Sequence, residues 1–144
     1  MLLLDVNVLV YAYREDALNH SAYRRWLMDL VSSGEPFGVA NIVLSGFLRI
    51  VTHPKIFKPP SPIGNALEFA AALRGQPNCA MIVPGPKHWQ IFMDLCQVTE
   101  ACGNLIPDAY LAALAIEADL EWITTDGDFS RFPGLRLRHP LAGL

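Results

Sequence analysis

LLLDVNVLVYA, the stretch from residue 2 to residue 12, is apolar enough for a buried β-strand except at one position. Asp5 places a carboxylate inside this run, and an isolated ionised carboxylate taken out of water is strongly destabilising unless something compensates it. The compensating group could be a hydrogen-bond donor, a basic side chain or a metal ion. The rest of the sequence has to decide among the three.

The hydrophobic pattern predicts strands that alternate with helices along one domain, residues 1–144. Strands are expected at 2–4, 36–40, 79–83, 121–124 and 135–137, and residues 6–11 can hold a strand end, a turn and a helix start. Helices are expected at 20–31, 41–51, 62–74, 86–102 and 108–118, with Asn41 as the cap of the second and Pro107 opening the last. Residues 55–64 form a proline-rich loop. This alternation is typical of the α/β class, with a central parallel sheet of four to five strands flanked by α-helices.

The composition restricts the function classes. The chain is 52% hydrophobic and 17% charged, with a net charge of -3, so no overall basic field indicates nucleic-acid binding. Any such site must be a local patch or must work through a metal. The three cysteines lack metal-ligand spacing and are expected to be free thiols. No apolar run approaches the ~20 residues of a membrane span, so we expect a cytoplasmic protein with no membrane contact.

The acidic residues gather at predicted strand ends. Asp5 ends the first strand, Asp126 and Asp128 follow WITT at the end of another, and Asp108 lies in the first turn of an apolar helix. Each has a simple structural explanation: Asp5 could cap a helix, Asp108 could favour the helix dipole, and Asp126-Gly127 is a common turn pair.

Taken together, however, these acids would meet at one edge of the sheet, where parallel-sheet proteins bind ligands. Like charges so close repel unless a cation joins them. Oxygen ligands without His or Cys favour Mg²⁺, or Mn²⁺ as a substitute, over zinc. A divalent cation in an acidic pocket can catalyse phosphodiester hydrolysis, because it activates a water and stabilises charge on the attacked phosphate.

Three stretches closely resemble the PIN-domain ribonucleases, and in particular the VapC-type toxins of bacterial VapBC toxin–antitoxin systems. They are LLLDVNVLVYA (2–12), VLSGFLRIVTHP (43–54) and NLIPDAYLAALAIEADLEWITTDGDFSRFPGL (104–135). The resemblance implies a PIN-like fold and a Mg²⁺-dependent endoribonuclease that cuts structured RNA such as tRNA or rRNA. It also implies a cognate VapB-type antitoxin that silences the enzyme, and a homodimer.

The resemblance also implies roles for individual residues. It gives Asp5, Asp108, Asp126 and Asp128 as the catalytic acids, the first three as metal ligands, and Asn7 and Thr124 as supporting polar groups. One position departs from the family. Gly46 stands where a Glu is usual, and no acid occurs between Glu35 and Glu68. Either the four remaining acids suffice, with Asn41 or Ser45 bonding a metal-bound water, or a second metal binds weakly. The first alternative is favoured.

Basic residues without neighbouring acids are the candidate RNA contacts. Arg49 and Lys55 lie in one such stretch and Arg131 in another, where they could follow a phosphate backbone. Arg14 follows the first acid closely and could clamp an exposed base. For any one of these residues, a solvated surface is the simpler explanation.

Two other kinds of function compete with the nuclease. A metal-dependent phosphatase-type hydrolase would need a second acid two residues after Asp5, where Asn7 cannot transfer a proton. A non-catalytic metal- or RNA-binding PIN-like module would keep the acids without cleavage. Metal-dependent RNA cleavage distinguishes that module from the enzyme.

Overall fold

The computed structural model of the chain describes residues 1–142. Five strands form one sheet in the order β3-β2-β1-β4-β5, with all neighbours parallel. The strands are β1 (Leu2–Leu4), β2 (Phe37–Val39), β3 (Cys79–Met81), β4 (Glu121–Ile123) and β5 (Leu137–Arg138). The helices are α1 (Val6–Tyr13), α2 (His20–Ser32), α3 (Asn41–Val51), α4 (Ile63–Arg74), α5 (His88–Val98), α6 (Leu105–Glu117) and the short 3₁₀-helix η1 (Gly127–Arg131). The α/β class and the parallel five-stranded sheet are confirmed.

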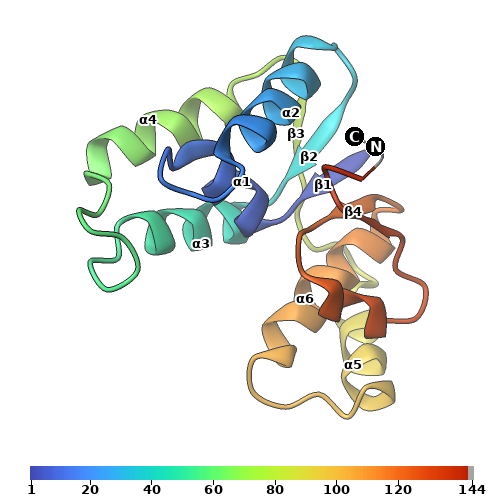
Figure 1. Cartoon of the computed structure of the whole chain (residues 1–144). Helices are drawn as coiled ribbons and strands as arrows, with labels where there is room; N and C mark the ends of the chain where they lie inside the picture. Colours follow the sequence, from blue (N-terminus) through green and yellow to red (C-terminus); the bar gives the residue numbers. More distant parts are fainter. Residues whose placement is uncertain (143–144) are drawn as a thin grey trace.

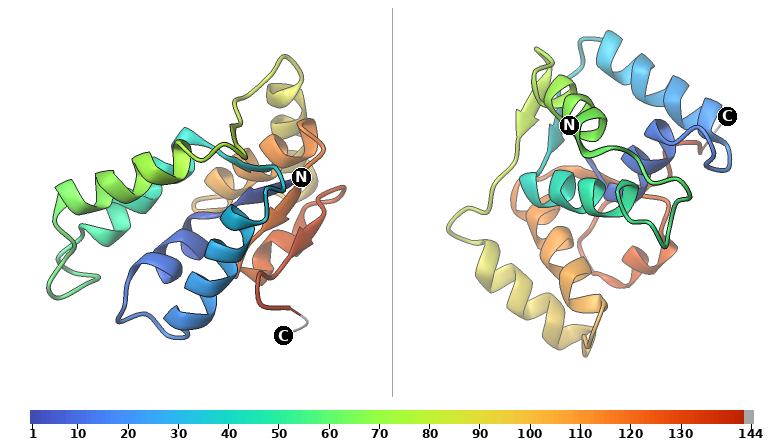
Figure 2. Two further views of the ribbon diagram at one scale, coloured as in Figure 1. Left: turned by 90° about the horizontal axis from the view of Figure 1, so that it is seen from above. Right: turned by 90° about the vertical axis from the view of Figure 1, so that its left-hand side faces the viewer.

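The helices form two groups around the strands. In Figure 1, α1 to α4 gather at the upper left and α5 and α6 lie below, with the strands running between the groups. Figure 2 shows the same separation from two other sides. The central strands β1 and β4 are buried on both faces: Leu3, Leu4, Trp122 and Ile123 are all fully inaccessible to solvent. Their continuous apolar sequence is what a parallel strand covered on both faces requires.

The order in which strands are added to the sheet changes direction at β1. The chain runs outward from β1 through β2 to β3, then returns to place β4 on the other side of β1. The carboxyl ends of β1 and β4 therefore flank the topological switch point, where open parallel sheets bind their ligands.

Several local expectations were wrong. Residues 6–11 are helical throughout, without the strand end and turn expected before the helix start. Ala40 rather than Asn41 is the N-cap of α3, and α6 begins at Leu105, two residues before Pro107. Pro107 fits there because the first amides of a helix have no intrahelical acceptor. The helical spacing of Trp89 and Phe92 predicts that both lie in the core, but Trp89 is 61% exposed on α5.

None of the helices within residues 1–142 is long and apolar enough to cross a membrane. The three cysteines are free, as the sequence predicts: Cys79 and Cys96 are half-buried and Cys102 is exposed.

Candidate active site

The switch point brings Asp5 next to Thr124. Leu4 of β1 pairs with Ile123 of β4, and the Asp5 amide extends this pairing by donating to the Ile123 carbonyl at 3.0 Å. Each strand then ends in a polar side chain. The two side chains meet because the strands are parallel and in register.

Asp5 is buried and well bonded. Its carboxylate is only 5% exposed and accepts two hydrogen bonds, from the Val6 amide at Oδ1 (2.6 Å) and from the Thr124 hydroxyl at Oδ2 (2.7 Å). The bond from Val6 makes Asp5 the N-cap of α1, so the capping explanation from the sequence is correct. Two neutral donors, however, do not supply the opposite charge that a buried carboxylate needs.

The pKa of Asp5 reflects this lack of a compensating positive charge. Burial raises the pKa of its carboxyl to about 6, against the lowering effect of the Thr124 and Val6 hydrogen bonds. The charges of Asp108 and Asp126 raise it further. The Asp5 carboxylate therefore lies among other acids in an environment that favours its neutral form.

A chain of hydrogen bonds continues from Thr124 into η1. The Thr124 hydroxyl, itself buried, accepts from the Asp126 amide at 3.0 Å, and Asp126 Oδ1 accepts from the Asp128 amide at 2.9 Å. Asp126 thus caps η1, as its turn-like sequence suggests. One of its carboxylate oxygens is used in this cap. Asp128 is exposed and lies 3.7 Å from Arg131.

Asp108 approaches the same acids from the other group of helices. It lies in the first turn of α6 and is half-buried. Burial raises the pKa of its carboxyl, and the charges of Asp126 and Asp128 raise it further. Segments around residues 5, 108 and 126 therefore bring carboxylates close enough to interact electrostatically, as the sequence predicts.

The acids are neighbours but are not drawn together into a coordination sphere. Within the described residues, no three His, Cys, Asp or Glu side chains converge closely enough to hold a metal ion among them. Mg²⁺ keeps several of its waters and is usually held by one or two carboxylates, so direct ligation by three is not required. The donor set, which is composed of oxygen atoms with unbalanced negative charge, fits a hard divalent cation.

The supporting residues do not all lie at this edge. Asn7 is half-buried in the first turn of α1, two residues after Asp5. Ser45 lines a groove between α3 and α4 with Asn41, Leu44 and Leu48. Its neighbour Gly46 points about 100° away around the helix.

Gly46 faces Val6, the residue that follows Asp5. A Cβ at position 46 would lie 3.1 Å from Val6 Cγ2, which is a tight contact. The glycine therefore lets α3 lie close to the start of α1. This packing was not evident from the sequence, in which position 46 stands out only as a missing acid.

Among the predicted RNA contacts, Arg49, Lys55 and Arg131 are exposed. Arg14 differs because its side chain is only 12% exposed and is bonded to Asp16 and to the buried Ser61. The expectation that Arg14 clamps a base gains no support from a guanidinium that is engaged within the protein. Sequence reasoning missed both partners. Ser61 could not be found because no local pattern links residues 47 positions apart, whereas Asp16 lies only two residues after Arg14.

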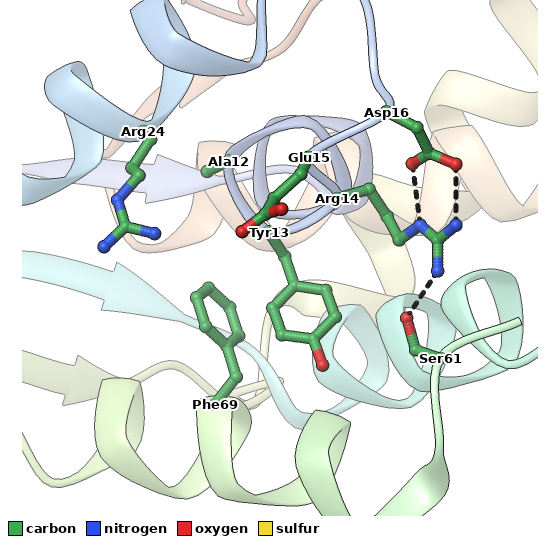
Figure 3. Close-up of a pocket in the computed structure, with 8 residues that line it drawn as sticks. All are labelled: Ala12, Tyr13, Arg14, Glu15, Asp16, Arg24, Ser61 and Phe69. Atoms are coloured by element: carbon green, nitrogen blue, oxygen red, sulfur yellow. Dashed lines mark hydrogen bonds and ion pairs between the residues drawn. The ribbon is translucent and has the colours of Figure 1, made fainter.

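An open pocket near α1 lies away from the acids. It is lined by Ala12, Tyr13, Arg14, Glu15, Asp16, Arg24, Ser61 and Phe69 (Figure 3). The pocket lies at the C-terminal end of α1, whereas Asp5 caps the N-terminal end. Eight helical residues separate the two places, or about 12 Å along the axis. The acid cluster and this pocket are therefore distinct sites.

Comparisons with known proteins agree with this geometry. The family model of the PIN domain matches residues 2–135. Ribonuclease VapC43 from Mycobacterium tuberculosis is 43% identical over 143 residues, which cover 99% of this chain and 97% of that protein. Ribonuclease VapC25 from the same organism is 42% identical over 142 residues, covering 98% of this chain and all of that protein.

Solved structures show the same fold. VapBC2 from Rickettsia felis, bound to a DNA fragment from its promoter, matches with a TM-score of 0.70 at 19% identity over 95% of this chain and 96% of that one. Mycobacterium tuberculosis VapC20, described as a toxin that cleaves the sarcin-ricin loop, matches with a TM-score of 0.65 at 17% identity over 94% and 99%. The acids at the switch point, the family match and the full-length relatives agree: this chain belongs to the PIN-domain family and, within it, to the VapC ribonucleases.

Proposed function

We propose that this protein is a metal-dependent endoribonuclease toxin of a type II toxin–antitoxin module, acting through the edge formed by Asp5, Asp108 and Asp126. The observation that carries the proposal is the buried Asp5 carboxylate, placed among other acids at the switch point with its pKa raised to about 6. A site in which several carboxylates lie together, partly shielded from water, is suited to bind a cation. The cation can in turn bind a phosphate.

Asp5, Asp108 and Asp126 would hold Mg²⁺, with Mn²⁺ as a substitute. A bound divalent cation supplies an activated water and stabilises charge on the attacked phosphate. Within the chain, Thr124 orients the Asp5 carboxylate by donating to Oδ2, and the same hydroxyl fixes the turn that carries Asp126. Asp128 lies beside this turn, where we expect it to contribute charge. Asn7 is expected to bond a water at the edge.

The substrate class follows from the relatives rather than from the site. VapC43 and VapC25 are named ribonucleases, and VapC20 is described as cleaving the sarcin-ricin loop. We propose a structured RNA, a tRNA or an rRNA, as the substrate. The exposed Arg49, Lys55 and Arg131 would contact its phosphates.

We also propose a VapB-type antitoxin as the regulatory partner, because the Rickettsia felis neighbour was solved as a VapBC complex. A basic antitoxin side chain that reached the acids would compete with the cation by charge alone. A homodimer and a single domain over residues 1–144 complete the proposal.

The test is cleavage of total cellular RNA by antitoxin-free protein in Mg²⁺, in Mn²⁺ and in EDTA. Discrete fragments that require the metal would support the proposal, and sequencing their ends would name the substrate. Well-folded protein that cut no RNA under any of these conditions would favour a non-catalytic RNA-binding module instead.

A further inference from the structure

Arg14 lies at the end of α1 and contacts three residues, Asp16, Phe57 and Ser61. Its Nε and Nη2 donate to the two carboxylate oxygens of Asp16 at 2.9 and 2.7 Å, and its Nη1 donates to Ser61 Oγ at 3.0 Å (Figure 3). The guanidinium also lies over the ring of Phe57, 4.3 Å from its centre. A two-pronged bond to a carboxylate and stacking on an aromatic ring are geometries that only arginine provides.

Two of these partners, Phe57 and Ser61, belong to the loop between α3 and α4, residues 52–62. The loop is also tied to the end of α3, since the Ser61 amide donates to the Val51 carbonyl at 2.8 Å. Ser61 is 7% exposed, so its hydroxyl is a buried polar group whose hydrogen bond is made with Arg14. Arg14 thus connects the loop to α1, the helix that Asp5 caps.

The loop 52–62 lies in a basic stretch of the sequence that contains no acid. From residue 36 to residue 67 the sequence contains Arg49, Lys55 and Lys58 and no acid, a net charge of +3. All three side chains are exposed, and none takes part in an ion pair within residues 1–142. Because no carboxylate neutralises them, these cations are free to bind phosphate.

The loop is placed to meet RNA that is bound at the acids. Helix α3 begins beside the carboxyl edge of the sheet and has eleven residues, so the loop lies about 16 Å away from that edge. Figures 1 and 2 show the loop at the end of α3 farthest from the sheet. A strand cut at the acids would reach the loop a few nucleotides from the cleaved bond.

We propose that Arg14 is a positioning residue, which holds the loop 52–62 so that Lys55 and Lys58, with Arg49, bind phosphates that flank the cleavage site. The inference rests on the proposed RNA cleavage. Arg14 itself is not placed to contact RNA, because its side chain is only 12% exposed, three of its five N–H donors are bonded to Asp16 and Ser61, and one face lies on Phe57. This assigns Arg14 to the organisation of the RNA-binding surface rather than to the surface itself.

Limited trypsin digestion, in the absence of RNA, tests whether Arg14 keeps the loop 52–62 in place. Trypsin can cut after Lys55, whereas Pro59 blocks a cut after Lys58. Arg14→Gln should raise the rate of cleavage at Lys55 about tenfold, since local opening exposes the loop to the protease. The matched control is Arg24→Gln, because Arg24 lines the same pocket but is exposed and has no ion pair within the described residues. Equal cleavage rates in Arg14→Gln and Arg24→Gln would overturn the positioning role.

The consequence for RNA is tested by binding a labelled single-stranded RNA 20-mer of random sequence in EDTA, which prevents cleavage. Arg14→Gln should weaken binding about tenfold and flatten its salt dependence as much as the Lys55→Gln/Lys58→Gln variant does. Combining all three substitutions should add little, because they remove the same contacts.

Asp16→Ala separates positioning from direct contact. Positioning predicts weaker RNA binding although a negative charge has been removed, because Arg14 loses its main partner. Direct contact by Arg14 predicts tighter binding, and that result would overturn the inference. At saturating RNA the Arg14→Gln variant should keep its kcat while KM rises.

Failure of the proposed RNA cleavage can be distinguished from failure of the positioning role of Arg14. A parent protein that neither bound nor cut RNA would refute RNA cleavage and the phosphate contacts together, whatever trypsin showed. Intact RNA binding in Arg14→Gln, beside a parent that cuts RNA, would refute the inference alone.

Discussion

The hydroxyl of Thr124 donates a 2.7 Å hydrogen bond to Oδ2 of Asp5, joining the ends of two adjacent parallel strands that are 119 residues apart in sequence. The Thr124 hydroxyl oxygen, Oγ1, in turn accepts from the Asp126 amide at 3.0 Å. The buried hydroxyl of Thr124 thus orients the Asp5 carboxylate and fixes the turn that carries Asp126. The arrangement depends on a hydroxyl that donates in one direction and accepts from the other.

Thr124→Val should lower the cleavage rate about ten- to hundredfold, the effect of losing one hydrogen bond to a charged group. Thr124→Ser keeps the hydroxyl and should stay within a few-fold of the parent. Single-turnover rates on one RNA fragment measure both. If the valine and serine variants were equally active, the hydroxyl would have no part in placing Asp5.

Asp5→Asn should abolish cleavage and yet stabilise the metal-free protein at neutral pH. The folded carboxyl has a pKa of about 6, above the value of about 4 in an unfolded chain. The native state therefore binds more protons than the unfolded state between about pH 4 and pH 6, so ionisation of Asp5 reduces stability as the pH rises through that range. Removing the charge should stabilise the fold by about 1–3 kcal/mol above pH 6 and by almost nothing below pH 4.

Thermal unfolding of the parent and Asp5→Asn in EDTA, from pH 4 to pH 8, checks this. The difference in Tm should grow with pH. In a parallel series without EDTA, Mg²⁺ should raise the Tm of the parent and leave that of Asp5→Asn nearly unchanged, because only a native binding site gives stabilisation by the ligand. A pH-independent difference in Tm would show that the carboxyl is not held in an unfavourable environment.

Asp108→Asn should also abolish cleavage while the fold survives, because Asp108 is half-buried at the edge of the core and contributes charge rather than packing. The matched control is Asp94→Asn, which removes an exposed helical acid from α5. Cleavage rates and circular dichroism of both variants measure the effect. Full activity in Asp108→Asn would remove this residue from the site.

Gly46→Glu, which restores the usual family acid, should lower the Mg²⁺ concentration that gives half-maximal rate. The added side chain must also displace Val6, since a Cβ at position 46 would lie 3.1 Å from Val6 Cγ2. Gly46→Ala isolates this steric effect and is the proper reference. The same Mg²⁺ midpoint in the alanine and glutamate variants would mean that position 46 does not face the cation.

The sequence predicted the sheet because its strands are short, apolar and bounded by clear helix patterns. It predicted the acid edge because parallel strands deliver their carboxyl ends to one side. Features that depend on contacts between distant segments were not predictable. Ser61 has no local pattern that shows it as a partner of Arg14, and Gly46 appears as a missing acid although its backbone packs against Val6. Trp89 was misplaced because helical spacing shows which residues share a face but not whether another element covers that face.

The measurement that tests the central claim most directly is the single-turnover rate of one RNA cleavage as a function of Mg²⁺, for the parent, Asp5→Asn and Asp94→Asn. If Asp5 is buried directly after the first strand to hold a catalytic cation, the rates of the parent and Asp94→Asn will rise and saturate with Mg²⁺. Asp5→Asn will then stay at the level of the EDTA control at every concentration. An Asp5→Asn variant that cut the same RNA at the parent's rate would contradict the account.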